Sequence, residues 1–274
     1  MSVINTNVSA MYSQNAMKTN ARHMSTAMEQ LSTGTRVNSA KDDAAGLAIG
    51  QNMTTQIRGL NMAVRNLNDG INMMQTAEGA MIEQSNMLQR MRELAVQSMN
   101  GTYSSVQRSY LDLEFQQLSS QINDISTDTK WNDQVLLDAS VGTFTFQAGN
   151  ASGDTVSVVI GDMGISGLLK NIDGQDIKDY DAAADSLTAI TSALEEINNQ
   201  RAAIGAGINR MEYAADNLTN VSSNATQSRS TIMDTDYALT TTMLAKTQII
   251  QQAATAMLAQ ANQQPQGVMT LLKG

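Results

Sequence analysis

Hydrophobic residues recur at alternating spacings of three and four through the region from about residue 42 to residue 97. The series consists of Ile57, Leu60, Val64, Leu67, Ile71, Met74, Met81, Leu88 and Ala95, with polar interruptions at Glu78, Ser85 and Arg92. This is the heptad pattern of a helix that packs along a seam. Because no proline intervenes, the pattern predicts one helix of about 55 residues, roughly 80 Å long.

Two further heptad series predict two more helices. The second series follows a turn-like Asn100-Gly101-Thr102 and consists of Leu111, Phe115, Leu118, Ile122 and Ile125. The third consists of Leu187, Ile190, Leu194, Ile197, Ile204, Ile208, Met211, Ala215, Leu218 and Ala225, with Arg201 and Ser222 as its polar members. The short turn predicts that the second helix folds back on the first. The expected fold is mainly α, with long antiparallel coiled-coil helical rods.

Between the second and third series the hydrophobic period changes from 3.5 to two. The alternating residues are Phe144, Phe146 and Ala148, then Val156, Val158 and Ile160, and they flank a Gly- and Asn-containing stretch at 149–154. This pattern predicts a β-hairpin over about residues 143–161. The scattered Gly and Asp residues that follow, up to residue 181, indicate an irregular loop and not a further domain.

Both ends of the chain also carry helical seams of similar length and composition. They are Met17, Ala21, Met24, Met28 and Leu31 at the first end, and Met243, Thr247, Ile250, Ala254, Met257 and Ala261 at the second. The first helix is expected to end at Gly34, and the second near Pro265 and Gly267. Such narrow seams bury little area against an ordering cost of about 1–2 kcal/mol per residue. We therefore expect the ends to be disordered in the monomer and to order on assembly.

Charge separates the ends from the middle of the chain. The net charge is -9, whereas the first 40 residues carry +2 and the last 35 carry +2, which leaves -13 for residues 41–239. The near-neutral ends are rich in Asn, Gln, Ala and Met, so they suit burial together. The acidic total argues against nucleic acid as the main partner. Aromatic residues make up only 4% of the chain, which argues against a thick globular core.

The composition leaves few residues for catalysis or metal binding. Cysteine is absent, and the single His23 cannot form the usual multi-ligand metal site, so we expect a helix-surface or seam position for it. Asp42 and Asp43 stand where the long helix begins, which favours a capping role over a metal site. We expect no enzymatic activity, no cofactor and no metal.

No stretch of the sequence approaches the roughly 20 apolar residues that span a bilayer, so membrane insertion is not expected. Residues 1–10 also lack the basic and apolar regions of a cleaved signal peptide. If the protein leaves the cell, we expect another export route.

Short motifs near both ends resemble those of the bacterial flagellin family, and the resemblance extends over essentially the whole chain. The first half has Val3-Ile4-Asn5-Thr6-Asn7, Leu31-Ser32-Thr33-Gly34, and Asn38-Ser39-Ala40-Lys41-Asp42-Asp43-Ala44-Ala45-Gly46-Leu47-Ala48-Ile49. The second half has Gln200-Arg201-Ala202-Ala203-Ile204-Gly205-Ala206, Ala245-Lys246-Thr247-Gln248-Ile249-Ile250-Gln251-Gln252-Ala253, and Gln260-Ala261-Asn262-Gln263-Gln264-Pro265-Gln266-Gly267. Together these motifs are highly specific.

The resemblance implies a structural subunit that polymerises into the extracellular flagellar filament for swimming motility. Residues 1–41 and 236–274 would form an inner domain in the filament core, and residues 42–235 a helical rod domain with the hairpin. Many relatives insert variable outer domains after the hairpin, but only about residues 162–182 are available here, so none is expected. Export would use the flagellar type III apparatus. The implied partners are other copies of the chain, an export chaperone, the filament cap and the hook-junction proteins.

The segment at 88–97 is similar to the patch by which related flagellins meet the Toll-like flagellin receptor of animal hosts. The resemblance assigns to this patch Gln89, Arg90, Leu94, Gln97 and Glu114. An alternative is that Arg90 and Glu114 serve subunit packing, and the same surface could do both.

Three other classes share parts of this pattern. A hook-filament junction protein with flagellin-like ends is the nearest alternative. The helical hairpin of chemoreceptor cytoplasmic domains would also give long heptad rods, but it explains neither the β-hairpin nor the nearly acid-free ends. A flagellin with a zinc-protease insert would need a His-Glu-x-x-His helix, which one histidine excludes.

Overall fold

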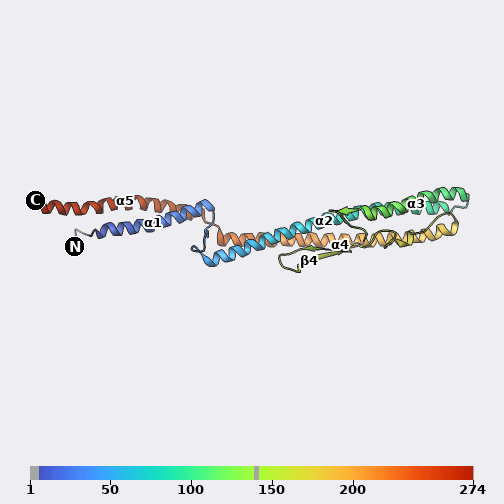
Figure 1. The fold of residues 1–274 in the computed structure, drawn as a ribbon, viewed down its shortest axis with the longest axis horizontal. Coiled ribbons are helices and arrows are strands. Elements are labelled where there is room, and N and C mark those ends of the chain that lie inside the picture. Colours follow the sequence, from blue (N-terminus) through green and yellow to red (C-terminus); the bar gives the residue numbers. More distant parts are fainter. Residues whose placement is uncertain (1–5, 139–141, 274) are drawn as a thin grey trace. The chain divides into compact units, whose positions relative to one another are not determined.

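The computed structural model describes residues 6–138 and 142–273, with side chains up to residue 263. In chain order the helices and strands are α1 (Val8–Thr33), α2 (Ala44–Ser98), α3 (Ser105–Asp128), β1 (Lys130–Trp131), β2 (Gln134–Val135), β3 (Thr143–Gln147), β4 (Thr155–Val159), the 3₁₀ helix η1 (Lys170–Ile172), α4 (Tyr180–Met233) and α5 (Tyr237–Lys273). Figure 1 traces them along the chain. The mainly α fold with long helices and a small hairpin is confirmed.

Contacts divide the chain into two compact units. We call residues 1–57 with 223–274 the terminal unit, and residues 58–222 the central unit. Both α2 and α4 contribute to each of them. The domain boundaries predicted from the sequence, at 41/42 and 235/236, instead fall in the loops beside these two helices. The division into an inner domain and a rod domain stays a prediction.

Local side-chain chemistry explains where the first two helices end and begin. Gly34 ends α1 with a left-handed φ of 72°, and its N–H donates to the Gln30 carbonyl at 2.9 Å. Asp43 caps α2 by accepting a hydrogen bond from the Gly46 N–H at 2.8 Å. The predicted C-cap at Gly34 and the capping role of Asp43 are therefore confirmed.

Asp42 stabilises the turn that precedes this cap. Its Oδ2 accepts hydrogen bonds from the Ser39 hydroxyl and the Ser39 N–H, both at 3.0 Å. These bonds, the hydroxyl bond foremost, lower the pKa of Asp42 below its ordinary value.

Two antiparallel helix pairs build the central unit. Gln84 on α2 donates through Nε2 to the Ile122 carbonyl on α3 at 3.1 Å, and Arg90 reaches Glu114 further along the pair. Ser222 on α4 donates to Asn61 on α2 at 2.8 Å. The three predicted heptad series lie on the buried or half-buried faces of these helices.

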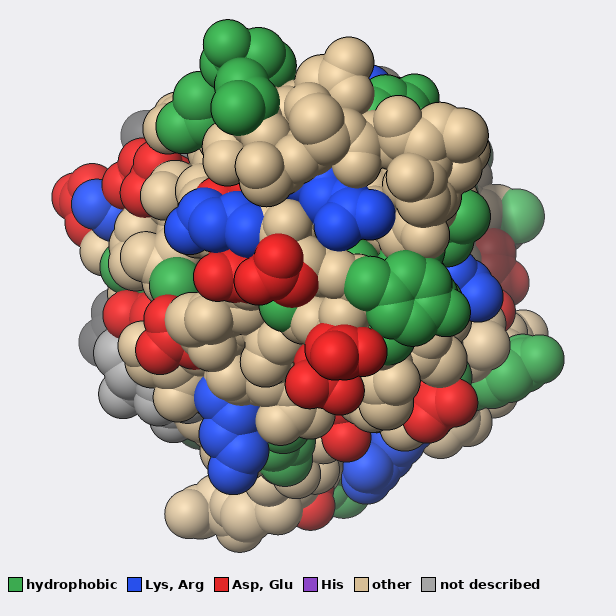
Figure 2. Space-filling view, turned by 90° about the vertical axis from the view of Figure 1, so that its right-hand side faces the viewer, with side chains coloured by type: hydrophobic (Ala, Val, Ile, Leu, Met, Phe, Trp, Pro, Cys, Tyr) green, Lys and Arg blue, Asp and Glu red, His purple; other side chains and the backbone are tan. Residues whose placement is uncertain are grey.

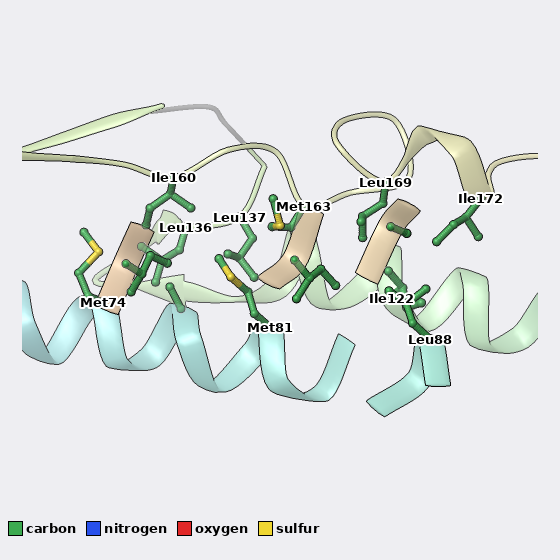
Figure 3. Packing of buried hydrophobic residues seen from close by; sticks show 14 of the residues in the cluster. Met74, Met81, Leu88, Ile122, Leu136, Leu137, Ile160, Met163, Leu169 and Ile172 are labelled. Carbon is green, nitrogen blue, oxygen red and sulfur yellow. The ribbon is translucent and has the colours of Figure 1, made fainter. Parts of the chain in front are cut away.

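The connecting segments complete the core of the central unit. Figure 3 shows Met74, Met81 and Leu88 of α2 and Ile122 of α3 beneath side chains from the connections after α3 and after the hairpin. Those covering residues are Leu136, Leu137, Ile160, Met163, Leu169 and Ile172, each no more than 1% exposed. The segment between β4 and α4 is irregular as expected, but it forms part of the core.

The predicted hairpin is formed by β3 and β4. Phe144 pairs with Val158 and Phe146 pairs with Val156 in an antiparallel register. Glycine on α4 allows close approach, because a Cβ at Gly207 would lie 2.9 Å from Val158. A second, unpredicted hairpin joins β1 to β2 through a turn in which Asn132 and Asp133 have φ values of 48° and 65°.

The expected end of the last helix is wrong. The backbone of α5 stays helical through residue 265 and continues to Lys273. Proline in a helix interior removes one hydrogen-bond donor and crowds the carbonyl four residues earlier. The carbonyl four residues before Pro265 is that of Ala261, and it accepts a hydrogen bond from Asn7 Nδ2 at 2.8 Å.

Candidate functional site

The two terminal helices pair with each other within the terminal unit. At one end of the pair, the Thr235 N–H just before α5 donates to the Gly34 carbonyl at 3.0 Å. At the other end, Asn7 donates through Nδ2 to the Ala261 carbonyl at 2.8 Å. The helices therefore run antiparallel, side by side, as Figure 1 shows.

A narrow, partly polar seam joins this pair. Its positions, spaced alternately by three and four, are Ser13, Met17, Asn20, Met24, Ala27 and Leu31 on α1 and Thr240, Leu244, Thr247, Gln251, Ala254, Leu258 and Ala261 on α5. Asn20 is buried and donates through Nδ2 to the Thr247 carbonyl at 2.8 Å and to Gln251 Oε1 at 3.1 Å. A buried polar residue at a seam position fixes helix register at a cost in stability.

Five of the eleven predicted seam residues lie outside this seam. Met17, Met24, Leu31, Thr247, Ala254 and Ala261 belong to it, whereas Ala21, Met28, Met243, Ile250 and Met257 are exposed. Pairing within the single chain therefore covers six of the eleven residues, and the assignment of all eleven to assembly stays a prediction. Apolar residues occur on both faces of these helices, and the seam itself includes Asn20 and Gln251, so the hydrophobic pattern did not distinguish the two faces.

We call these five exposed residues, Ala21, Met28, Met243, Ile250 and Met257, the outer stripe. Other large hydrophobic side chains of the two helices are also at least half exposed. They are Val8, Met11 and Tyr12 on α1 and Tyr237, Leu239 and Ile249 on α5. Apolar patches of this kind mark sites of association in soluble proteins.

A charged cluster lies on α2 and α3 of the central unit. Arg90 donates through Nε to Glu114 Oε1 and through Nη1 to Glu93 Oε2, both at 2.9 Å. These carboxylates, Glu114 first, raise the pKa of Arg90. Gln89 and Gln97 are exposed nearby on α2. The structure thus brings together four of the five residues predicted for a receptor patch.

Leu94 is the exception, because its side chain is only 1% exposed and belongs to the central core. Its predicted place in a surface patch is wrong for this conformation. Since α2 packs against both α3 and α4, its buried face is wider than one heptad seam.

A groove of about 750 Å³ lies beside this cluster, between α2 and α4. Gln89, Arg92 and Gln97 line it from α2, and Arg201 lines it from α4. Arg201 Nη2 lies 3.5 Å from Glu78 Oε1, while its buried Nε has no acceptor among the described residues. The sequence patterns marked Arg92 and Arg201 only as polar interruptions of a seam. Figure 2 shows that basic and acidic side chains are interspersed on one end face of the structure.

Neither a metal centre nor a membrane span is found in the described part of the chain. No group of three or more His, Cys, Asp or Glu residues there could hold a metal ion. No described helix combines the length and apolar character needed to cross a membrane.

Together, the paired terminal helices with their outer stripe and the long packed rods define a self-associating helical structural protein. Family profiles agree with this class: the bacterial flagellin N-terminal helical region matches residues 4–142, and the C-terminal helical region matches residues 187–272. The chain belongs to the bacterial flagellin family, whose members are structural subunits of the extracellular flagellar filament and serve motility.

Similar proteins support the same assignment. The chain is 44% identical to a flagellin of Halalkalibacterium halodurans, covering 99% of this chain and 100% of that protein. It is 34% identical to flagellin B of Vibrio cholerae, covering 98% and 99% of the two proteins.

Two solved structures resemble the fold. The crystal structure of Bacillus cereus flagellin is 30% identical, with a TM-score of 0.50, and the match covers 56% of this chain and 88% of that one. A putative flagellar hook-associated protein from Vibrio parahaemolyticus has a TM-score of 0.59 at 14% identity, with 70% and 99% covered, which shows likeness of fold alone. The comparisons favour the filament subunit over the hook-junction alternative.

Proposed function

We propose that the terminal helices are the polymerising part of this subunit, and that the outer stripe is the surface by which copies join. The observation that carries the proposal is that each terminal helix has apolar residues on two faces, of which pairing covers one. Met28, Met243 and Met257 are 51%, 48% and 64% exposed in the single chain. Contact with the same helices of other copies would remove these side chains from water.

The small area of the seam supports coupling of order to assembly. Its buried residues are the small or polar Asn20, Ala27, Thr240, Thr247 and Ala261. At about 25 cal/mol per Å² such residues contribute little against the ordering entropy of two long helices. The ends are therefore disordered in the free subunit and become ordered as it docks.

Deletion of residues 1–30 or 245–274 tests this proposal. Each variant should remain a soluble, helical monomer that no longer polymerises, because the central core is retained while the terminal pair is lost. Circular dichroism would measure helicity, and electron microscopy would detect filaments. Filaments formed by either variant would refute the proposal.

A point substitution tests the outer stripe separately from the seam. Ile250→Asp places a carboxylate at a 40% exposed position of α5, so the free subunit should be unchanged while polymerisation is abolished. The matched control, Asn209→Asp, adds the same charge at an exposed position of α4 in the central unit. Equal polymerisation of the two variants in light scattering would contradict the assignment of the stripe.

Our proposal assigns this chain a structural role without catalysis, in contact with the partners implied by its family. These partners are an export chaperone, the filament cap and the hook-junction proteins. With only residues 160–179 between β4 and α4, the rods and the hairpin would form the filament surface. A fluorogenic peptide-hydrolysis assay of purified filaments should therefore give only the background rate.

A host Toll-like flagellin receptor is a second candidate partner, favoured by the exposed Arg90 cluster. The Arg90 and Glu114 side chains are 50% and 45% exposed, and each is held in place by the other. Paired, pre-positioned charges of this kind are common at binding hot spots. An Arg90→Ala monomer should lose receptor affinity, whereas Arg65→Ala, an exposed arginine elsewhere on α2, should not. Unchanged affinity of the Arg90 variant would remove this candidate.

A further inference from the structure

The course of α5 through Pro265 leaves one backbone carbonyl without its usual donor. In an α-helix the N–H of residue 265 would donate to the carbonyl of residue 261, but proline has no N–H. Ala261 is only 8% exposed, so water has little access to this position. A buried carbonyl without a partner would oppose continuation of the helix to Lys273.

Asn7 supplies a donor to this same carbonyl. Its Nδ2 donates to the Ala261 oxygen at 2.8 Å, across a separation of 254 residues in the chain. The other end of the amide, Oδ1, accepts a hydrogen bond from the Ala10 N–H at 3.0 Å and so caps α1. The Asn7 side chain therefore caps the start of α1 and also donates to the α5 carbonyl that lacks its usual helical donor.

We propose that Asn7 is the positioning residue of the terminal pair, because it replaces the hydrogen bond that Pro265 cannot make. The position of the free carbonyl marks one place on α5, so the contact sets the register of α1 against α5. It also makes helix formation beyond Pro265 depend on the presence of the N-terminal cap. This inference rests on the proposed function, in which the terminal pair orders during polymerisation.

The chemistry of this contact requires an amide. Aspartate is an N-cap as good as asparagine, but its carboxylate has no N–H to donate. Serine can also cap α1, but its shorter side chain reaches less far. Asn7→Asp therefore retains the cap and removes the donor, and it also places a negative charge beside the carbonyl oxygen.

A double-mutant cycle on the full chain tests the proposal. The four proteins are the unmodified chain, Asn7→Asp, Pro265→Ala and the double variant. The readout is the concentration of free subunit that remains at equilibrium with filaments. Asn209→Asp, at an exposed position of α4 in the central unit, controls for the added charge.

Asn7→Asp should raise the free-subunit concentration by about tenfold, the effect expected for loss of a donor to a buried carbonyl. Pro265→Ala restores the helical N–H, so this variant should polymerise at least as well as the unmodified chain. The double variant should stay within about threefold of Pro265→Ala, since Asn7 no longer has a missing donor to replace. Asn209→Asp should stay within about twofold of the unmodified chain.

Two results would overturn the inference. One is an equal effect of Asn7→Asp and Asn209→Asp, and the other is a tenfold effect of Asn7→Asp that persists in the Pro265→Ala background. Failure of the unmodified chain to polymerise would instead refute the proposed function. Hydrogen exchange of residues 266–273 in the filaments gives a second readout: Asn7→Asp should lower their protection, and Pro265→Ala should restore it.

Discussion

The terminal and central units are both built from long helices, but different kinds of side chain pack between the helices of each unit. In the central unit, large apolar side chains such as Phe115, Leu67 and Met81 are completely buried, and the connecting segments cover them. In the terminal unit, the seam between α1 and α5 buries Ala27 and Ala261 beside Asn20 and Thr247. Buried apolar area stabilises the central unit, whereas hydrogen bonds at defined positions align the two helices of the terminal unit.

This difference separates stability from specificity. A core of large side chains tolerates small changes in alignment as long as volume is conserved. A seam with few apolar contacts gains less from burial, but its polar groups are satisfied in only one register. The central unit therefore gains stability from burial, whereas the terminal pair gains a defined register from its hydrogen bonds.

The largest expected effect comes from the central core. Phe115→Ala removes an aromatic side chain with 0% exposure, so it should lower the free energy of unfolding by about 3–5 kcal/mol. Urea unfolding followed by circular dichroism would measure this change. Leu113→Ala, at a 63% exposed position of the same helix, is the control and should have little effect. Similar losses for both variants would contradict the contrast between the units.

A smaller effect is expected at a polar group within the same core. Asp112 is 4% exposed, accepts a hydrogen bond from the Ile177 N–H at 3.2 Å and lies 3.4 Å from Lys178 Nζ. Asp112→Ala leaves the buried Ile177 N–H unpaired, which should cost about 1–3 kcal/mol in the same urea measurement. Asp124→Ala on the exposed face of α3 should leave the unfolding free energy within about 0.5 kcal/mol.

In the terminal unit the corresponding polar substitution should act on assembly instead of on unfolding of the free subunit. Asn20→Ala removes the bonds to Thr247 and Gln251, a loss of about 1 kcal/mol. This corresponds to about a fivefold rise in free subunit at equilibrium with filaments, by the usual relation of 1.4 kcal/mol per tenfold. Urea unfolding of the free subunit should not change. A clear shift in that unfolding curve would show that the terminal pair already stabilises the monomer.

The smallest expected effect is a local dependence on acid in the turn before α2. The Ser39 hydroxyl holds the pKa of Asp42 below its ordinary value of 3.8. The ionised carboxylate therefore stabilises the turn at pH values above 3.8, and this contribution is lost as the pH falls through the lowered pKa of Asp42. Ser39→Ala should raise the pKa of Asp42, which NMR titration of its carboxyl carbon would measure. An unchanged pKa of Asp42 in the Ser39→Ala variant would show that the Ser39 hydroxyl does not lower this pKa.

Sequence patterns predicted the elements whose burial follows one simple period. The three heptad series, the alternating residues of the hairpin and the caps at Gly34 and Asp43 are local signals, and the structure confirms each of them. The β1–β2 hairpin was missed, although the dipeptide Asn132-Asp133 suits the left-handed turn that joins its strands.

Other features depend on contacts between distant residues. Periodicity could not choose between the two apolar faces of α1, since the correct seam contains the polar Asn20 and omits Met28. Pro265 taken alone predicts the end of a helix, but Asn7, 258 residues earlier, supplies the donor that the proline lacks. Leu94 was assigned to a surface patch by family resemblance, but it is buried because α2 packs on two sides.

The segment between β4 and α4 determines where this subunit could display foreign peptides. Met163, Leu169, Ile172 and Ile177 anchor the segment to the core along most of its length, so an insertion at either end would detach part of that core. Gly174 is different, because it is exposed, has a φ of 71° and has open space around it. Since loop closure costs only about 0.6 kcal/mol for each doubling of length, an epitope grafted beside Gly174 should leave the rod intact.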